Sequence, residues 1–254
     1  MQTKHDIPFK LKTVNAQNNN TFKNKRELIL SVLDQSKPNA YVPAAFFLHF
    51  DHKLGAKAVQ DHVNFFRATN MDIVKIQYEI VVPRLDIKAA RQRGADGFYI
   101  SSQGGDDKTF GKTKVFTEYV RPFDKKISEV ANEIAPVNIL HICDYGSSYG
   151  TIDDYTDYPA SIINPPIHVG KGSLDLKHVA EVFKRPVFGG LDRLGVIANG
   201  SLEEAKAAVD KVLENAPDNF ILGADCTVPS STDYDKLRAV IDYAHNWRST
   251  HQKK

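Results

Sequence analysis

The sequence predicts an α/β protein in which buried parallel strands alternate with helices. Short and almost continuous apolar runs recur along the chain, and residues 42–50 (VPAAFFLHF) are a clear example. A run of this kind is typical of a strand that is covered on both faces, as in a parallel sheet. Segments with apolar residues at helical spacing follow these runs, so the pattern indicates consecutive βαβ units.

Seven strands separated by helices can be assigned in this way. The strands are expected at residues 42–50, 72–78, 97–102, 137–143, 160–163, 186–190 and 219–225. The helices are expected at residues 25–34, 56–69, 87–93, 112–134, 174–183, 202–215 and 234–247. Ser201 and Glu204 have the spacing of a capping box, which marks the start of helix 202–215. Because a closed barrel of parallel strands uses eight, we predict an incomplete (β/α) barrel of TIM type with about seven parallel strands.

Length and composition predict one domain with a small-molecule partner. The chain has 254 residues, of which 42% are hydrophobic, and this is enough for one well-covered core. Residues 1–24 are expected to form a flexible tail and residues 25–254 the barrel. The formal charge is only +2, so no strong field favours nucleic acid or an anionic membrane as the partner.

The expected compartment is the reducing cytoplasm. The tail contains no apolar run long enough for a signal peptide or a membrane-spanning helix. The chain has two cysteines, and without a secretory signal they do not indicate a disulfide framework.

Polar residues end most of the predicted strands. In parallel (β/α) barrels the active site lies at the carboxyl ends of the strands, so these residues are the candidates for chemistry. They are His49, Asp51, Gln77, Glu79, Ser101, Ser102, Gln103, His141, Cys143, Asp144, Asn164, Asp192, Arg193, Asp225 and Cys226.

The clearest constellation is His141 with Cys143, joined by Cys226 at the end of another strand. Residues two apart on a strand point to the same side, so His141 and Cys143 can both face the barrel mouth. One imidazole and two thiolates suit Zn²⁺, which keeps an open position when it is catalytic. The alternative is that both cysteines are ordinary buried residues, because an isolated H-x-C pattern also arises by chance.

A second group lies on the strand at residues 72–78. Lys75, Gln77 and Glu79 occupy alternating positions, so they share one face and can line the cavity. The alternative for this group is a salt-bridged strand end.

Several stretches resemble the uroporphyrinogen decarboxylase superfamily. They are residues 47–51 (FLHFD), 71–79 (MDIVKIQYE), 94–105 (GADGFYISSQGG), 138–144 (NILHICD), 186–204 (PVFGGLDRLGVIANGSLEE) and 220–232 (FILGADCTVPSST). The resemblance implies a TIM-type barrel, which agrees with the strand pattern. Members of the superfamily are usually longer, and the difference falls between Glu79 and Ile87 as an internal deletion. About one strand with its helices is therefore expected to be absent.

Two branches of the superfamily imply different chemistry. The decarboxylases carry an arginine-rich early loop and a catalytic aspartate after the second strand, whereas this chain shows no such loop and has Glu79 at the matching position. The cobamide-dependent methyltransferases carry a zinc motif of H-x-C and a distant Cys, which His141, Cys143 and Cys226 match. This resemblance implies zinc-dependent methyl transfer between a corrinoid carrier and a thiol or related acceptor, with a corrinoid protein as partner.

The resulting assignment has three groups of site residues. The expected metal ligands are His141, Cys143 and Cys226; the catalytic candidates are Glu79, Asp192 and Asp225; the substrate-binding candidates are His49, Lys75, Gln77, Gln103 and Arg193. Zn²⁺ is the expected cofactor, and the corrinoid is a substrate carrier rather than a bound cofactor.

Two alternative functions stay open. A metal-free porphyrinogen decarboxylase would hold the carboxylates of its substrate with cationic side chains such as Arg84, Arg91 and Arg193. A truncated, non-catalytic member would bind a tetrapyrrole or a corrinoid protein. In either case an open barrel leaves two strand edges, so we expect dimerisation or coverage of the edges near Gln77 and Gly97.

Overall fold

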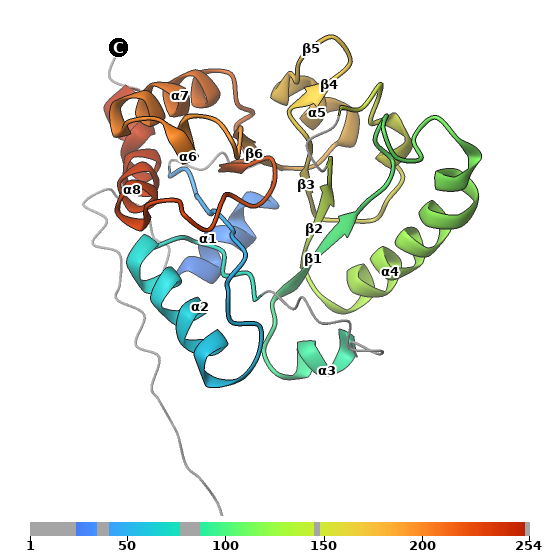
Figure 1. Cartoon of the computed structure of the whole chain (residues 1–254), viewed down its shortest axis with the longest axis horizontal. Coiled ribbons are helices and arrows are strands. Elements are labelled where there is room, and N and C mark those ends of the chain that lie inside the picture. Colours follow the sequence, from blue (N-terminus) through green and yellow to red (C-terminus); the bar gives the residue numbers. More distant parts are fainter. Residues whose placement is uncertain (1–23, 35–40, 77–86, 145–147, 252–254) are drawn as a thin grey trace, which may run out of the picture.

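A five-stranded parallel sheet forms the centre of the computed structural model, which describes residues 24–34, 41–76, 87–144 and 148–251. The strand order is β1-β2-β3-β6-β7 (Figure 1). The bounds are β1 (Gly97–Ser102), β2 (Val137–Ile142), β3 (Ile162–Asn164), β6 (Val187–Leu191) and β7 (Phe220–Ala224). Each strand pairs in parallel with its neighbour, as expected when helices connect the strands.

Two extended segments continue the sheet beyond β7. Residues 42–50 follow β7, because Ala44 bridges to Leu222 and Leu48 bridges to Val228. The amide of Asp72 then donates to the carbonyl of Ala44 at 2.9 Å, which places residues 72–76 next in order. The fold is therefore an incomplete (β/α) barrel, as the sequence predicts.

Five of the seven predicted strands are regular strands of the sheet. The segments at residues 42–50 and 72–76 are not regular strands, and here the prediction was wrong. Residues 42–50 form isolated bridges, and Pro43, which has no amide proton, takes part only through its carbonyl. Residues 72–76 are joined to this segment through a hydrogen bond at their first residue. Residues 77–86, where the deletion is expected, lie outside the described part of the chain, as does the predicted tail up to residue 23.

The helices lie close to their predicted positions. They are α1 (Lys25–Val32), α2 (Gly55–Thr69), α3 (Ile87–Gln92), α4 (Arg121–Ile134), α5 (Leu176–Phe183), α7 (Leu202–Glu214) and α8 (Tyr234–His251). The capping box of Ser201 and Glu204 is confirmed at the start of α7. The helix predicted at residues 112–134 is only in part a regular α-helix, because the π-helix η1 (Phe116–Val120) precedes α4.

Four short elements were not predicted. They are η2 (Asp153–Tyr155), α6 (Val196–Asn199), β4 (His168–Val169) and β5 (Gly172–Ser173). The last two form a small antiparallel hairpin. Each has two to four residues, which is too short to produce a readable hydrophobic period.

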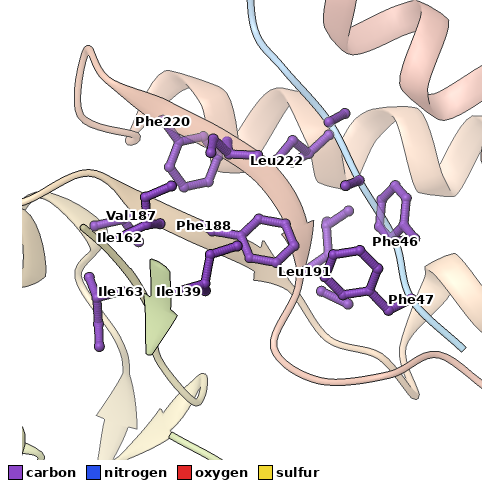
Figure 2. Packing of buried hydrophobic residues seen from close by; sticks show 14 of the residues in the cluster. Phe46, Phe47, Ile139, Ile162, Ile163, Val187, Phe188, Leu191, Phe220 and Leu222 are labelled. Carbon is purple, nitrogen blue, oxygen red and sulfur yellow. The ribbon is translucent and has the colours of Figure 1, made fainter. Parts of the chain in front are cut away.

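Aromatic side chains fill the inside of the barrel. Phe188 of β6 is 1% exposed, and its ring centroid lies 5.6 Å from that of Phe47. Figure 2 shows Phe188 in the middle of the buried cluster, with Ile139 of β2 beside it. Phe47 in turn contacts Tyr99 of β1 edge to face, with 5.5 Å between the centroids. Burial of one such side chain contributes about 2 to 3 kcal/mol, so this cluster holds strands from distant parts of the chain together.

The described helices include none that is both long enough and apolar enough to cross a membrane.

Candidate metal centre

Three candidate ligands converge at the carboxyl ends of two strands. His141 lies at the end of β2, Cys143 follows this strand, and Cys226 follows β7 by two residues. One ligand atom from each of the three residues lies within 4.8 Å of the others, and the two sulfur atoms are 4.0 Å apart. Because β3 and β6 lie between β2 and β7, the curvature of the sheet brings the two cysteines together across the barrel mouth.

The buried imidazole supports a metal-binding role. His141 is 2% exposed, and neither of its ring nitrogens has a hydrogen-bond partner among the described residues. A buried polar group without a partner typically costs about 1 to 3 kcal/mol, so a ligand is expected here. Two Zn–S bonds of about 2.3 Å at the tetrahedral angle place the sulfurs roughly 3.8 Å apart, close to the observed spacing. The donor set therefore fits Zn²⁺.

The electrostatic surroundings favour a thiolate at Cys226. A hydrogen bond from the thiol of Cys143 lowers the pKa of Cys226, and the nearby His141 lowers it further. These effects outweigh burial, which by itself raises the pKa of the thiol. A thiolate is the form of cysteine that binds metals.

The ring of His141 is held by an aromatic neighbour from β1. Tyr99 stacks on it with 5.1 Å between the centroids and an interplanar angle of 29°. The hydroxyl of Tyr99 donates to Asn164 Oδ1 at 2.8 Å, and burial raises its pKa, so the hydroxyl keeps its proton. Tyr99 was missed by the sequence analysis, although it lies two residues before Ser101 and therefore on the same strand face.

Asn164 connects four strands beneath the site. Its Nδ2 donates to the carbonyl of Phe188 at 2.8 Å and to that of Ala224 at 3.2 Å, while its Oδ1 accepts from Tyr99. Gly189 has φ +139°, and a Cβ at this position would lie 3.1 Å from Asn164 Nδ2. A glycine is therefore needed for the amide of Asn164 to reach β6 and β7.

One guanidinium joins the segments that carry the two cysteines. Arg193 Nη2 lies 3.0 Å from Asp144 Oδ1, and Nη1 lies 2.7 Å from Asp225 Oδ2. The backbone amide of Arg193 also donates to Asp225 Oδ1 at 2.8 Å. Burial raises the pKa of Asp225 to about 6, although Arg193 opposes this shift.

The backbone of Cys143 is fixed from two directions. Its amide donates to the carbonyl of Ser102 at 3.0 Å, and its carbonyl accepts from the hydroxyl of Tyr149 at 2.7 Å. Tyr149 is 1% exposed and was not found by the sequence analysis, because its partner is a main-chain atom.

The other predicted site residues take different places. The ammonium of Lys75 lies 4.4 Å from the centroid of the Tyr99 ring, inside the barrel. His49 and Gln103 are exposed, and Asp192 is partly buried and accepts from the amide of Leu194 at 2.8 Å. Gln77 and Glu79 lie outside the described residues, so their predicted roles stay predictions.

Two relatives match 63% of the chain. Methylcobamide:CoM methyltransferase MtbA of Methanosarcina mazei is 26% identical over 161 residues, which cover 63% of this chain and 45% of the relative. The protein of the same name from Methanosarcina acetivorans is 23% identical over the same shares. The chain thus spans about half the length of the curated relatives it matches.

A solved structure and a family model agree with this match. The structure is a methyltransferase from Methanosarcina mazei, with a TM-score of 0.51 and 18% identity over 63% of this chain and 45% of the other. At this identity the likeness shows the fold. Residues 87–247 match the family model described as Uroporphyrinogen decarboxylase (URO-D), which is more than half of the chain. The chain therefore belongs to the uroporphyrinogen decarboxylase family.

Proposed function

We propose that this chain binds one Zn²⁺ through His141, Cys143 and Cys226 and transfers a methyl group from a corrinoid carrier to a thiol or related acceptor. The observation that carries the proposal is the convergence of three donors of the type that zinc prefers, two of them buried, with an imidazole whose nitrogens have no hydrogen-bond partner among the described residues. The names of the relatives, which are methylcobamide:CoM methyltransferases, support the same reaction class.

Some residues of the site would bind the metal or the substrate, and others orient these ligands. Bound at this site, Zn²⁺ would keep the thiol of the substrate as its thiolate, the nucleophilic form. Cys143, Cys226 and His141 would hold the ion, and the thiol of the substrate would bind to it beside them. Tyr99 fixes the plane of the imidazole, and Lys75 lies over the same tyrosine ring, so we place Lys75 among the substrate-binding residues.

Two of the sequence-based assignments change under this proposal. Arg193 is 12% exposed at its side chain and is engaged by two carboxylates, so it is poorly placed to grip a substrate. Asp225 has both oxygens bound to Arg193, which favours a positioning role over proton transfer. We keep Asp192 as a catalytic candidate, and His49 and Gln103 as rim residues that contact the substrate.

The decarboxylase alternative has little support among the described cations. Arg193 is bound as above, and Arg91 Nη1 donates to the carbonyl of Ala95 at 3.0 Å. Arg84 lies outside the described residues. A decarboxylase of this family type would need such side chains to hold the substrate carboxylates.

Metal content and methyl transfer test the proposal together. We expect purified protein to bind one zinc per chain and to convert methylcobalamin in the presence of a thiol, which the visible spectrum of the corrinoid follows. Cys226→Ser should lower both zinc occupancy and thiol methylation while circular dichroism stays unchanged. Folded protein that takes up no zinc would contradict the proposal. Zinc binding without turnover would support the non-catalytic alternative, which a titration with cobalamin and porphyrin would then examine.

We also propose that the open side of the barrel is covered by a second copy of the chain. Tyr119, Phe123 and Ile127 recur every four residues across η1 and α4, and they are 68%, 66% and 48% exposed. Arg121 and Lys125 bind Asp157 on the other flank of this helix, so the apolar residues face away from Asp157, and α4 packs against β1 at the end of the described sheet. Sedimentation of the wild type and of Phe123→Glu tests this, and a wild-type monomer would contradict it.

A further inference from the structure

We infer that Arg193 is a positioning residue that sets the spacing between Cys143 and Cys226 and thereby the affinity of the site for metal. This inference rests on the proposed zinc site and deepens it. Its basis is a juxtaposition of side chains from three separate segments, which meet at the barrel mouth.

Each cysteine is the chain neighbour of an aspartate. Asp144 follows Cys143, and Asp225 precedes Cys226. The two aspartates are both 2% exposed at their side chains, and both pair with the same guanidinium. Arg193 itself lies in the turn after β6, so its side chain links the ends of two other strands, β2 and β7.

The sheet alone does not fix the distance between the cysteines. β2 and β7 are not neighbours in the described sheet, because β3 and β6 separate them. A small change in sheet curvature would therefore move one sulfur relative to the other. The two ion pairs of Arg193, at 3.0 Å and 2.7 Å, provide a direct link between the two segments.

The chemistry of arginine suits this role. The guanidinium is planar and rigid, so Nη1 and Nη2 hold their partners at a defined separation. The turn that carries it is also fixed, because Asp192 Oδ1 accepts from the amide of Leu194 and the amide of Gly195 donates to the carbonyl of Asp192 at 3.1 Å. The backbone amide of Arg193 binds Asp225 as well, so the carboxylate is held from two atoms of one residue. A lysine could not make both side-chain contacts with the same geometry.

The expected effect is on metal affinity rather than on the identity of the ligands. Loss of a group that orients metal ligands typically lowers metal affinity by about 10- to 100-fold. We expect Arg193→Met to fall in this range, and Arg193→Lys to retain one of the two carboxylate contacts and lie between Arg193→Met and the wild type. Asp144→Asn should resemble Arg193→Lys, because it weakens only the Cys143 half of the link.

The test measures zinc affinity by competition with a chromophoric chelator and the spectrum of the Co²⁺-substituted protein. In Arg193→Met, the cobalt–thiolate absorption should weaken or shift, since the spacing and orientation of the two sulfurs are no longer fixed. Arg185→Met is the matched control: Arg185 is partly buried and donates to the carbonyls of Tyr158, Ala160 and Thr156, away from the cysteines. It should lower stability and leave zinc affinity unchanged. A folded Arg193→Met with wild-type zinc affinity and cobalt spectrum would overturn the inference.

A second reagent separates this inference from the zinc proposal. Phenylarsine oxide forms two As–S bonds with a close pair of thiols and releases water, and it does not require His141. If the wild type binds no zinc, the proposed function fails, whereas weaker arsenical binding by Arg193→Met than by Arg185→Met would still support the positioning role. Equal arsenical binding by the two variants would overturn it. If Arg193→Met does not fold, the same comparison is made with Asp144→Asn.

Discussion

The two ends of the barrel both contain buried carboxylates that pair with cations, but they differ in what is left unsatisfied. At the amino end, Asp72 has a fully buried side chain whose oxygens accept from Lys25, the amide of Ala44 and the ring of His245. At the carboxyl end, Arg193 binds two aspartates in a similar way, yet neither ring nitrogen of His141 has a hydrogen-bond partner among the described residues. A satisfied network holds the fold, whereas an unsatisfied buried donor set indicates a ligand.

The amino-end network joins three distant elements. Lys25 begins α1, Asp72 begins the segment next to residues 42–50, and His245 lies in α8. Tyr41 packs on the ring of His245 with 4.2 Å between the centroids. Loss of Asp72 would therefore remove the partner of both Lys25 and His245 and loosen two helices at once.

The largest expected effect is that of Asp72→Asn on stability. Removal of one partner from a buried ion pair typically costs about 3 to 5 kcal/mol, because the other charges stay buried without compensation. We expect a fall of this size in the free energy of unfolding, measured by urea titration of the metal-free protein. Zinc affinity of the folded fraction should not change, since the network lies at the opposite end of the barrel. A parallel loss of zinc affinity would show that the two ends are coupled.

The opposite pattern is expected for Cys143→Ser, which should lower zinc affinity strongly and stability little. This substitution changes one side-chain atom to a smaller and more polar one, so the free energy of unfolding of the metal-free protein should fall by no more than about 2 kcal/mol. Zinc affinity should fall by more than about 100-fold, because even groups that only orient ligands change affinity by 10- to 100-fold. Chelator competition measures the affinity, and Ser102→Ala next to the same strand end is a control for local disturbance. A Cys143→Ser protein that keeps its zinc would exclude this sulfur as a ligand.

The two ends of the barrel should respond to acid at different pH values. Burial alone raises the pKa of Asp72, but the hydrogen bond to His245 and the charges of His245 and Lys25 lower it below its ordinary value. Its contribution to stability is therefore complete above the unfolded pKa of about 3.9 and is lost as the pH falls through the lower folded value. Zinc should leave at higher pH, because its ligands must be deprotonated. Zinc release and circular dichroism followed in one acid titration should show two steps, and a single shared step would contradict the separation.

The sequence predicts the donor atoms of the metal centre better than the groups that hold them. His141 and Cys143 share a strand face by the period of two, and Cys226 ends another strand, so their convergence follows from the barrel pattern. Arg193 could be assigned only as a polar strand end, because its pairing with Asp144 and Asp225 depends on the curvature that brings three strand ends together. The same holds for Asp72 and His245, which are 173 positions apart. Residues 42–50 were predicted as a regular strand from their apolar pattern alone. That pattern takes no account of Pro43, which has no amide proton to donate to a neighbouring strand.

The smallest expected effect distinguishes two contributions of Tyr99, its ring and its hydroxyl. Tyr99→Phe keeps the ring that stacks on His141 but leaves Asn164 Oδ1 without this donor, so the free energy of unfolding should fall by about 1 kcal/mol. Zinc affinity should stay within about twofold of the wild type, because the orientation of the imidazole depends on the stacked ring. Tyr99→Leu removes the stacking as well and should lower zinc affinity by about tenfold, within the range for groups that orient metal ligands. The two variants are compared by urea unfolding of the metal-free protein and by chelator competition. If Tyr99→Phe lowers zinc affinity as much as Tyr99→Leu does, the hydroxyl and its bond to Asn164, rather than the stacked ring, orient the imidazole at the mouth of the barrel.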